Sequence, residues 1–236
     1  NGWITLSVTD NSLNASGKIN YVGTPTRFKW TEHFAGRGDL TRRLEASLTA
    51  NNELAALFGL DDSELWEGPV PLTLVYEARK NNKANLSAEL NLESTRFKVP
   101  GFEWEKPSGR PSKARFTASF DGATIRSVDR FKIEAGAFST SGKITFAEPL
   151  DDGTLSIDTV DLDKFRLEST ELAAAVRRDK DGQYIITVKG GSLNAAPFID
   201  QSQRIAEKSQ LPPFQLSGTF KKMLMGPGAP TNNVNK

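Results

Sequence analysis

The fold is decided by the segment LTLVYEARKNNKANLSAELNL, residues 72–92. Apolar residues occupy every second position from Leu72 to Tyr76 and again from Leu86 to Leu92, and Asn81-Asn82 between them is typical of a tight turn. Successive side chains of a β-strand point to opposite faces. The segment therefore predicts an antiparallel hairpin with one apolar and one polar face.

The same alternation continues on both sides of this hairpin. Ile4–Val8, Phe116–Phe120 and Leu155–Ile157 each place apolar residues at every second position. The turn Lys180-Asp181-Gly182 joins Leu172–Arg178 to Tyr184–Lys189, which is the clearest hairpin in the sequence. Further turn signals stand at Pro107-Ser108-Gly109, Asp121-Gly122 and Asp151-Asp152-Gly153. The chain is predicted to be an almost entirely antiparallel all-β protein.

Few segments have helical character. Asn52–Gly59 predicts a two-turn helix that is capped by Asn51 or Asn52 and ends at Gly59. Pro197–Ser209 predicts a second short helix that ends before Leu211-Pro212-Pro213. Residues 1–228 are interpreted as one continuous β segment, and residues 229–236 as a flexible tail.

One short motif recurs along the chain. Leu13–Tyr21 and Phe138–Phe146 both contain Ser-Gly-Lys-Ile, and Phe214–Phe220 is a looser third copy. Each copy predicts a strand with glycine near its centre, where strands bend or approach closely. The recurrence suggests a repeating β unit.

This pattern poses a physical problem. A dozen or so strands with one apolar face come with almost no helix to cover that face. The apolar face must therefore close on itself as a sandwich or barrel, or be covered by a partner or an apolar ligand. We expect eleven residues to share one concave side: Leu72, Leu74, Tyr76, Leu86, Leu90, Phe116, Phe120, Leu155, Ile157, Ile186 and Val188.

Composition excludes several classes of function. Lys and Arg number 30 against 29 Asp and Glu, so no basic field favours nucleic acid. Cysteine is absent, which excludes disulfides and thiolate metal sites. No apolar run approaches the ~20 residues of a membrane helix, and no signal peptide is visible. The chain begins at Asn1, and we expect it to be part of a longer polypeptide.

The sequence offers no catalytic constellation and implies no cofactor. His33 is the single histidine and is interpreted as a surface residue, so a site with two histidines is excluded. Asp61-Asp62 and Asp151-Asp152 are interpreted as turn or capping residues, with an acid–base or cation site as the alternative. Asp158–Asp163 lacks the glycine and the distal glutamate of a calcium loop. We expect the protein not to be an enzyme.

Residues 42–109 carry a resemblance to a known family. Leu57-Phe58-Gly59-Leu60 is followed by Gly68-Pro69-Val70-Pro71 at the start of a strand, and later by Trp104-Glu105-Lys106-Pro107-Ser108-Gly109. This order resembles the AsmA-like superfamily of Gram-negative envelope proteins, specifically its large YhdP-type members. The resemblance continues through Val188–Ile199 to residue 228, although Asn194 stands where the family usually has an acidic residue.

The resemblance implies a long twisted sheet curled into a U-shaped, taco-like groove. It also implies a periplasmic protein that is anchored in the inner membrane by parts missing here and reaches the outer membrane, with unknown envelope partners. The implied activity is transfer of phospholipid between the two membranes, with acyl chains in the groove. The eleven residues of the concave side would then line the lipid path, because each CH₂ group removed from water contributes about 0.8 kcal/mol.

A second interpretation requires no lipid. The same alternating residues could form the core of a closed β-sandwich that acts as a scaffold or binding module of the cell envelope. Both interpretations need one apolar face, and the sequence leaves both open.

Overall fold

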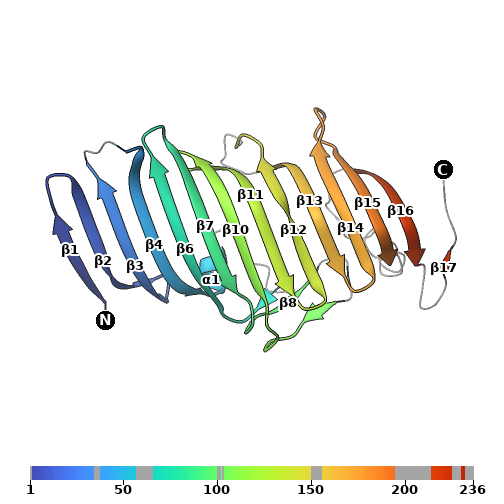
Figure 1. Ribbon diagram of the computed structural model, residues 1–236, viewed down its shortest axis with the longest axis horizontal. Helices are drawn as coiled ribbons and strands as arrows, with labels where there is room; N and C mark the ends of the chain where they lie inside the picture. Colours follow the sequence, from blue (N-terminus) through green and yellow to red (C-terminus); the bar gives the residue numbers. More distant parts are fainter. Residues whose placement is uncertain are drawn as a thin grey trace.

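The computed structural model describes residues 2–34, 38–56, 66–99, 102, 104–149, 156–194, 214–224 and 230–231. These residues form one sheet of 14 strands, a second sheet of three strands and one short helix (Figure 1). The large sheet contains β1 (Trp3–Val8), β2 (Ser12–Tyr21), β3 (Thr24–His33), β4 (Leu40–Ala50), β6 (Val70–Arg79), β7 (Lys83–Asn91), β10 (Lys113–Asp121), β11 (Thr124–Ala135), β12 (Phe138–Phe146), β13 (Ile157–Leu167), β14 (Thr170–Arg178), β15 (Tyr184–Asn194), β16 (Phe214–Leu224) and β17 (Pro230–Thr231). The small sheet contains β5 (Trp66–Glu67), β8 (Arg96–Lys98) and β9 (Glu105–Lys106), and the helix is α1 (Asn52–Ala56).

Strand order in the large sheet follows chain order, and every neighbouring pair is antiparallel except one. Short turns favour this arrangement, because an antiparallel neighbour can be reached through a few residues. The exception is the parallel pair β15–β16, in which Ile186 lies opposite Leu216. The sheet is open, since β1 and β17 lie at its two ends and do not pair. The predicted all-β, mostly antiparallel fold with few helices is confirmed, whereas the closed sandwich is not the arrangement seen.

The hairpin predicted around Lys180-Asp181-Gly182 is confirmed as β14 and β15. The Asp179 carboxylate accepts hydrogen bonds from the backbone N–H groups of Asp181 at 2.9 Å and Gln183 at 2.8 Å. Gly182 has a φ of +82°, a conformation that glycine adopts without steric cost. Local side-chain chemistry therefore favours this turn.

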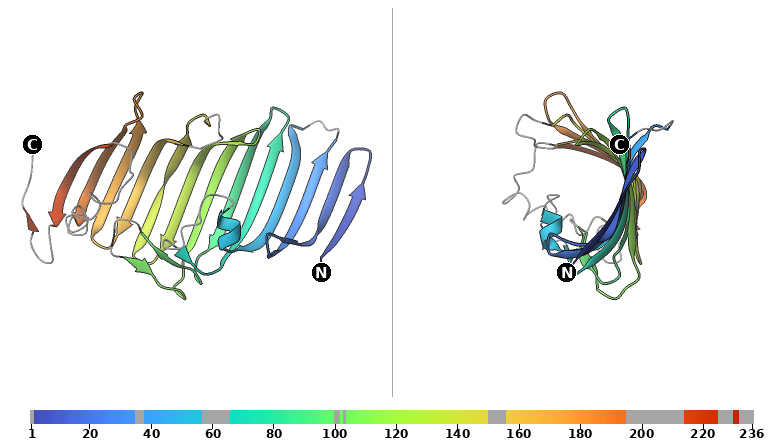
Figure 2. Two further views of the ribbon diagram at one scale, coloured as in Figure 1. Left: turned by 180° about the vertical axis from the view of Figure 1, so that it is seen from behind. Right: turned by 90° about the vertical axis from the view of Figure 1, so that its left-hand side faces the viewer.

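The sheet is curved, and Figure 2 shows α1 and the small sheet on its concave side. β-Bulges interrupt the register of several strand pairs in the half of the sheet that starts at β10. One bulge keeps both Val128 and Phe131 on the same face, opposite Ala118 and Phe116 respectively. Bulges increase the local twist of a strand and bend it, which favours a curled sheet over a flat one.

The helical predictions are met in part. α1 ends at Ala56 within the described residues, and Asn51 caps it by accepting a hydrogen bond from the Leu54 N–H at 2.9 Å. Gly59 and the predicted helix at Pro197–Ser209 lie outside the described residues. Two residues of the expected tail at 229–236 pair with β16 as β17.

The recurring glycine stands where neighbouring strands come unusually close. A Cβ atom added to Gly142 in β12 would lie 2.1 Å from the Asp161 carbonyl oxygen, and one added to Gly17 in β2 would lie 2.2 Å from that of Trp3. Both obstacles are backbone atoms and cannot rotate away. The Ser-Gly-Lys-Ile motif thus marks two places where the sheet tolerates no side chain.

Gly142→Ala should lower the free energy of unfolding by about 1–3 kcal/mol, because the methyl group would overlap the backbone of β13. The expected fall in Tm is about 2–4 °C per kcal/mol in thermal denaturation. The matched control is Gly191→Ala in β15, where nothing lies within 4 Å of the added Cβ. An unchanged Tm for Gly142→Ala would contradict the close approach of β12 and β13.

Candidate functional site

Apolar side chains of neighbouring strands meet on one face of the large sheet, here called the apolar face. Leu72 of β6 lies between Leu48 of β4 and Leu90 of β7. Tyr76 lies between Leu44 and Leu86 on the same strands. Opposed side chains in a sheet share a face, so these rows continue from strand to strand.

The register brings most of the sequence-predicted residues onto this face. Ten of the eleven residues have partners within the apolar rows, and Leu155 lies outside the described residues. Their strand neighbours Thr73, Glu89 and Thr117 point to the opposite face and are exposed. That these ten residues contact lipid stays a prediction.

The apolar face is the concave side of the sheet. Val99, which follows β8, packs in one buried cluster with Ala135, Phe138 and Leu167 at the ends of β11, β12 and β13. These three residues belong to the apolar face, and the small sheet lies on the concave side in Figure 2. Curvature and apolar character therefore coincide.

Most large side chains on this face are neither buried nor fully exposed. Among the predicted residues, Leu72, Tyr76, Leu90 and Phe116 are all half-buried. Exposure is greatest toward the ends of the sheet, with Leu6 of β1 60% exposed and Leu216 of β16 61% exposed. Removing apolar surface from water contributes about 25 cal/mol per Å². A broad apolar face that stays partly in water would therefore be stabilised by an apolar ligand that covers it.

One part of the apolar face is covered by aromatic side chains. We use the term aromatic lid for the small sheet together with Val99, Phe102 and Trp104. Trp104 lies 5.6 Å from Phe138 between ring centroids, and Phe102 stacks on Phe165 at 5.2 Å. Such pairs contribute about 0.5–1.5 kcal/mol beyond their burial. The lid is thus held on the floor of the sheet by ring contacts.

Lys106 joins the lid to the large sheet. Its side chain is 1% exposed, and its Nζ donates to the carbonyl oxygens of Leu92 at 2.5 Å, Glu93 at 2.8 Å and Thr95 at 2.7 Å. Burial lowers the pKa of the Lys106 ammonium group, and the charge of Glu93 opposes this shift. The three carbonyls replace the water that this ammonium group loses on folding.

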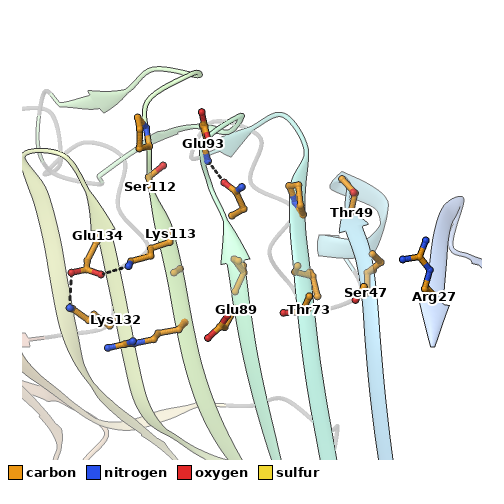
Figure 3. Close-up of a pocket in the computed structure, with 18 of the residues that line it drawn as sticks. Arg27, Ser47, Thr49, Thr73, Glu89, Glu93, Ser112, Lys113, Lys132 and Glu134 are labelled. Atoms are coloured by element: carbon orange, nitrogen blue, oxygen red, sulfur yellow. Dashed lines mark hydrogen bonds and ion pairs between the residues drawn. The ribbon is translucent and has the colours of Figure 1, made fainter. Parts of the chain in front are cut away.

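The opposite, convex face of the sheet is polar and slightly hollowed. A hollow of about 1050 Å³ lies over it, with Arg27, Thr73, Glu89 and Lys132 among its lining residues (Figure 3). Glu134 accepts from Lys132 at 2.6 Å and lies 3.5 Å from Lys113, which lowers the pKa of the Glu134 carboxyl. These exposed ion pairs contribute little stability and keep this face wetted.

The residues considered for catalysis or metal binding do not form a site in the described part of the chain. His33 is exposed at the end of β3, and Asp158–Asp163 lies in β13, where the register with β12 shifts at both ends of the segment. The described residues contain no group of three His, Asp or Glu side chains that could hold a metal ion. Asp61-Asp62 and Asp151-Asp152 lie outside them.

Comparison with known proteins finds no relative. The chain matches no protein-family model, no curated protein and no solved structure. None of the described helices is long and apolar enough to span a membrane.

Sequence patterns did not reveal the aromatic lid. Phe97, Phe102 and Trp104 lie far from Phe138 and Phe165 in the chain. Phe97 belongs to the three-residue strand β8, and Phe102 and Trp104 lie in the connection between β8 and β9, so no alternation marks them. The part of the sequence that could have indicated the lid is the segment Trp104–Gly109, which combines an aromatic residue with a turn. Gly109, with a φ of +82°, closes a turn by donating to the Glu93 carbonyl at 2.8 Å, next to the carbonyls that Lys106 holds.

Lys106→Met should destabilise the protein by about 2–4 kcal/mol, because three carbonyl groups would each lose a hydrogen bond from the buried ammonium group while the apolar stem is kept. Urea denaturation would measure this loss as a lower midpoint with an unchanged slope. Lys98→Met in β8 is the control, since Lys98 is exposed and should change stability by less than about 0.5 kcal/mol. Equal effects of the two substitutions would exclude the anchoring role of Lys106.

Proposed function

We propose that the protein binds the acyl chains of phospholipids on its apolar face and forms part of a path for lipid between the inner and outer membranes of a Gram-negative envelope. The observation that carries the proposal is the continuous apolar face of an open 14-stranded sheet, with large side chains left half-buried. A chain that transfers from a bilayer to such a face exchanges one apolar surrounding for another. Its movement from strand to strand across the sheet then carries little desolvation cost.

The shape of the sheet supports this function over a compact scaffold. A scaffold gains stability by burying its apolar residues, yet the buried apolar residues in the described part of the chain include four alanines, and the larger leucines of the floor stay half-buried. The rows also run across the strands, from Ile4 at one end of the sheet to Leu216 at the other. A path of this direction suits a cargo that moves along the long axis of the sheet.

The resemblance to AsmA-like proteins agrees with this proposal and supplies the biological setting. The periplasmic location, the inner-membrane anchor and the bridging of the two membranes come from that resemblance alone. A scaffold or binding module without lipid cargo is the competing function, and it predicts the same sheet with no bound lipid.

Phe116→Asp should abolish lipid binding while the protein stays folded. A carboxylate at this position of the open floor remains accessible to water, so the fold should lose only a modest part of its Tm, whereas an acyl chain would meet a hydrated charge. Lipid that co-purifies with the protein would be measured by native mass spectrometry, and uptake from vesicles by photo-crosslinking.

The matched control is Thr117→Asp, which places the same charge one residue away on the polar face. Normal lipid uptake is expected for this variant. Undiminished uptake by a folded Phe116→Asp protein would overturn the proposal, as would repeated preparations of wild-type protein without any bound lipid. Unfolding of both single variants, Phe116→Asp and Leu90→Asp, would indicate that these side chains are covered in the folded protein, which favours the scaffold.

A further inference from the structure

The two long edges of the apolar face differ in chemistry. One edge is formed by the ends of β3, β6, β10 and β12 and the starts of β4, β7 and β11, and it carries ion pairs; we call it the charged edge. Its pairs are Glu32–Arg42 at 3.1 Å, Asp39–Arg79 at 3.7 Å, Asp121–Lys83 at 2.6 Å and Glu148–Arg126 at 2.5 Å. All four join groups that water can reach.

The other edge differs in that apolar and aromatic groups cover it, although Arg96 of the small sheet and Glu134 of β11 form ion pairs there as well. The aromatic lid packs there against Phe138 at the start of β12 and Leu167 at the end of β13, which are 5% and 3% exposed. Further along the same edge, Leu54 of α1 and Val70 at the start of β6 are buried as well. Figure 2 shows α1 and the small sheet at this one edge.

Burial changes accordingly along β12 and β13, the strands beneath the lid. On β13, Leu167 beneath the lid is buried, Phe165 and Val160 are half-buried, and Ile157 near the charged edge is exposed. On β12, Phe138 and Thr140 are buried, whereas Ile144 and Phe146 are half-buried. An apolar strip therefore lies between a dry, closed edge and a wet, charged edge.

The length of this strip can be compared with that of an acyl chain. From Leu72 to Ala78 on β6, or from Thr140 to Phe146 on β12, the strand rises by about 20 Å at ~3.3 Å per residue. The hydrocarbon of one bilayer leaflet is about 15 Å deep. The two lengths are of the same order, and a chain laid along the strands reaches most of the way from the charged edge to the lid.

We propose, on the basis of the proposed function, that each acyl chain lies along the strands with its methyl end against the aromatic lid and its headgroup at the charged edge. The occupant is an amphiphile with a charged or zwitterionic headgroup. Its polar end meets paired charges in water, and its aliphatic end meets rings and aliphatic side chains. The lid then acts as a stop that limits the length of the bound chain, so it determines specificity.

The orientation is tested on the wild-type protein with two photoreactive phosphatidylcholines. Both have 16-carbon chains, and one carries a diazirine at the methyl end while the other carries it beside the ester. Peptide mapping should place the methyl-end label near the lid, at Ile133, Phe165 or Leu172, and the ester-side label near the charged edge, at Phe120, Phe146 or Ile157. The reverse pattern, or equal labelling of both regions by both probes, overturns the inference.

The length limit is tested with vesicles that contain equal amounts of phosphatidylcholines with chains of 12 to 20 carbons. Bound lipids are quantified by mass spectrometry after the protein is repurified. Wild-type protein should discriminate against the longest chains, by about fourfold for each methylene forced into water. Phe97→Ala removes a ring that contacts Trp104 and Phe138, so it should shift the bound population toward longer chains.

The control is Leu6→Ala in β1, at the end of the sheet distant from the lid, which should keep the wild-type length distribution. Lipid bound without any length limit, or a limit that Phe97→Ala leaves unchanged, refutes the stop while the proposed function stands. Absence of bound lipid of every length refutes the proposed function itself. The labelling pattern of the wild-type protein decides the orientation even if Phe97→Ala fails to fold.

Discussion

The structure depends on one constraint, which is that the backbone hydrogen bonds of 14 strands are satisfied within a single sheet. A continuous ladder fixes which side chains share a face, because a shift of one residue would move every side chain to the other side. The apolar residues are in phase from β1 to β16 as a result. The ladder satisfies the backbone but leaves one broad apolar face; among the described residues, the small sheet and α1 cover it along one edge.

Curvature follows from the same ladder. Twisted strands coil an open sheet. Bulges in the strand pairs from β10 to β15 bend it further, and the apolar residues on either side of each bulge still point to the same face. Gly17 and Gly142 permit the close strand approaches that bending requires. The polar face remains wetted by charged and hydroxyl side chains. The molecule thus combines a water-compatible outer surface with an inner surface that favours hydrocarbon.

The lid gives this inner surface a direction. It is attached by ring contacts to Phe138 and Phe165 and by the three hydrogen bonds of Lys106, and all of these lie at the ends of strands. Four ion pairs lie at the opposite, uncovered ends. A symmetric trough would accept an amphiphile in either orientation. A trough with one closed apolar edge and one charged edge distinguishes the two ends of a lipid, which is the basis of the proposed chain-length limit.

The sequence by itself determined the local structure and the division into faces. Period-two alternation around Leu72 and Leu86, and turns such as that at Gly182, depend on neighbours in the chain and were therefore predictable. Strict alternation alone would have misplaced Phe131 and Phe165, because bulges shift the register there. The parallel pair β15–β16 was also missed, since its register is set by residues far apart in sequence.

Only the tertiary structure decided whether the sheet closes and what covers it. An alternating strand has the same pattern in a sandwich core and on an open floor, because the pattern records a face and not its partner. The contact of Trp104 with Phe138, and the convergence of Lys106 on the carbonyls of the turn at 92–95, join segments from different strand connections. Such contacts arise from packing in three dimensions, which is why the sequence determined the apolar face and the fold alone determined its closed and open edges.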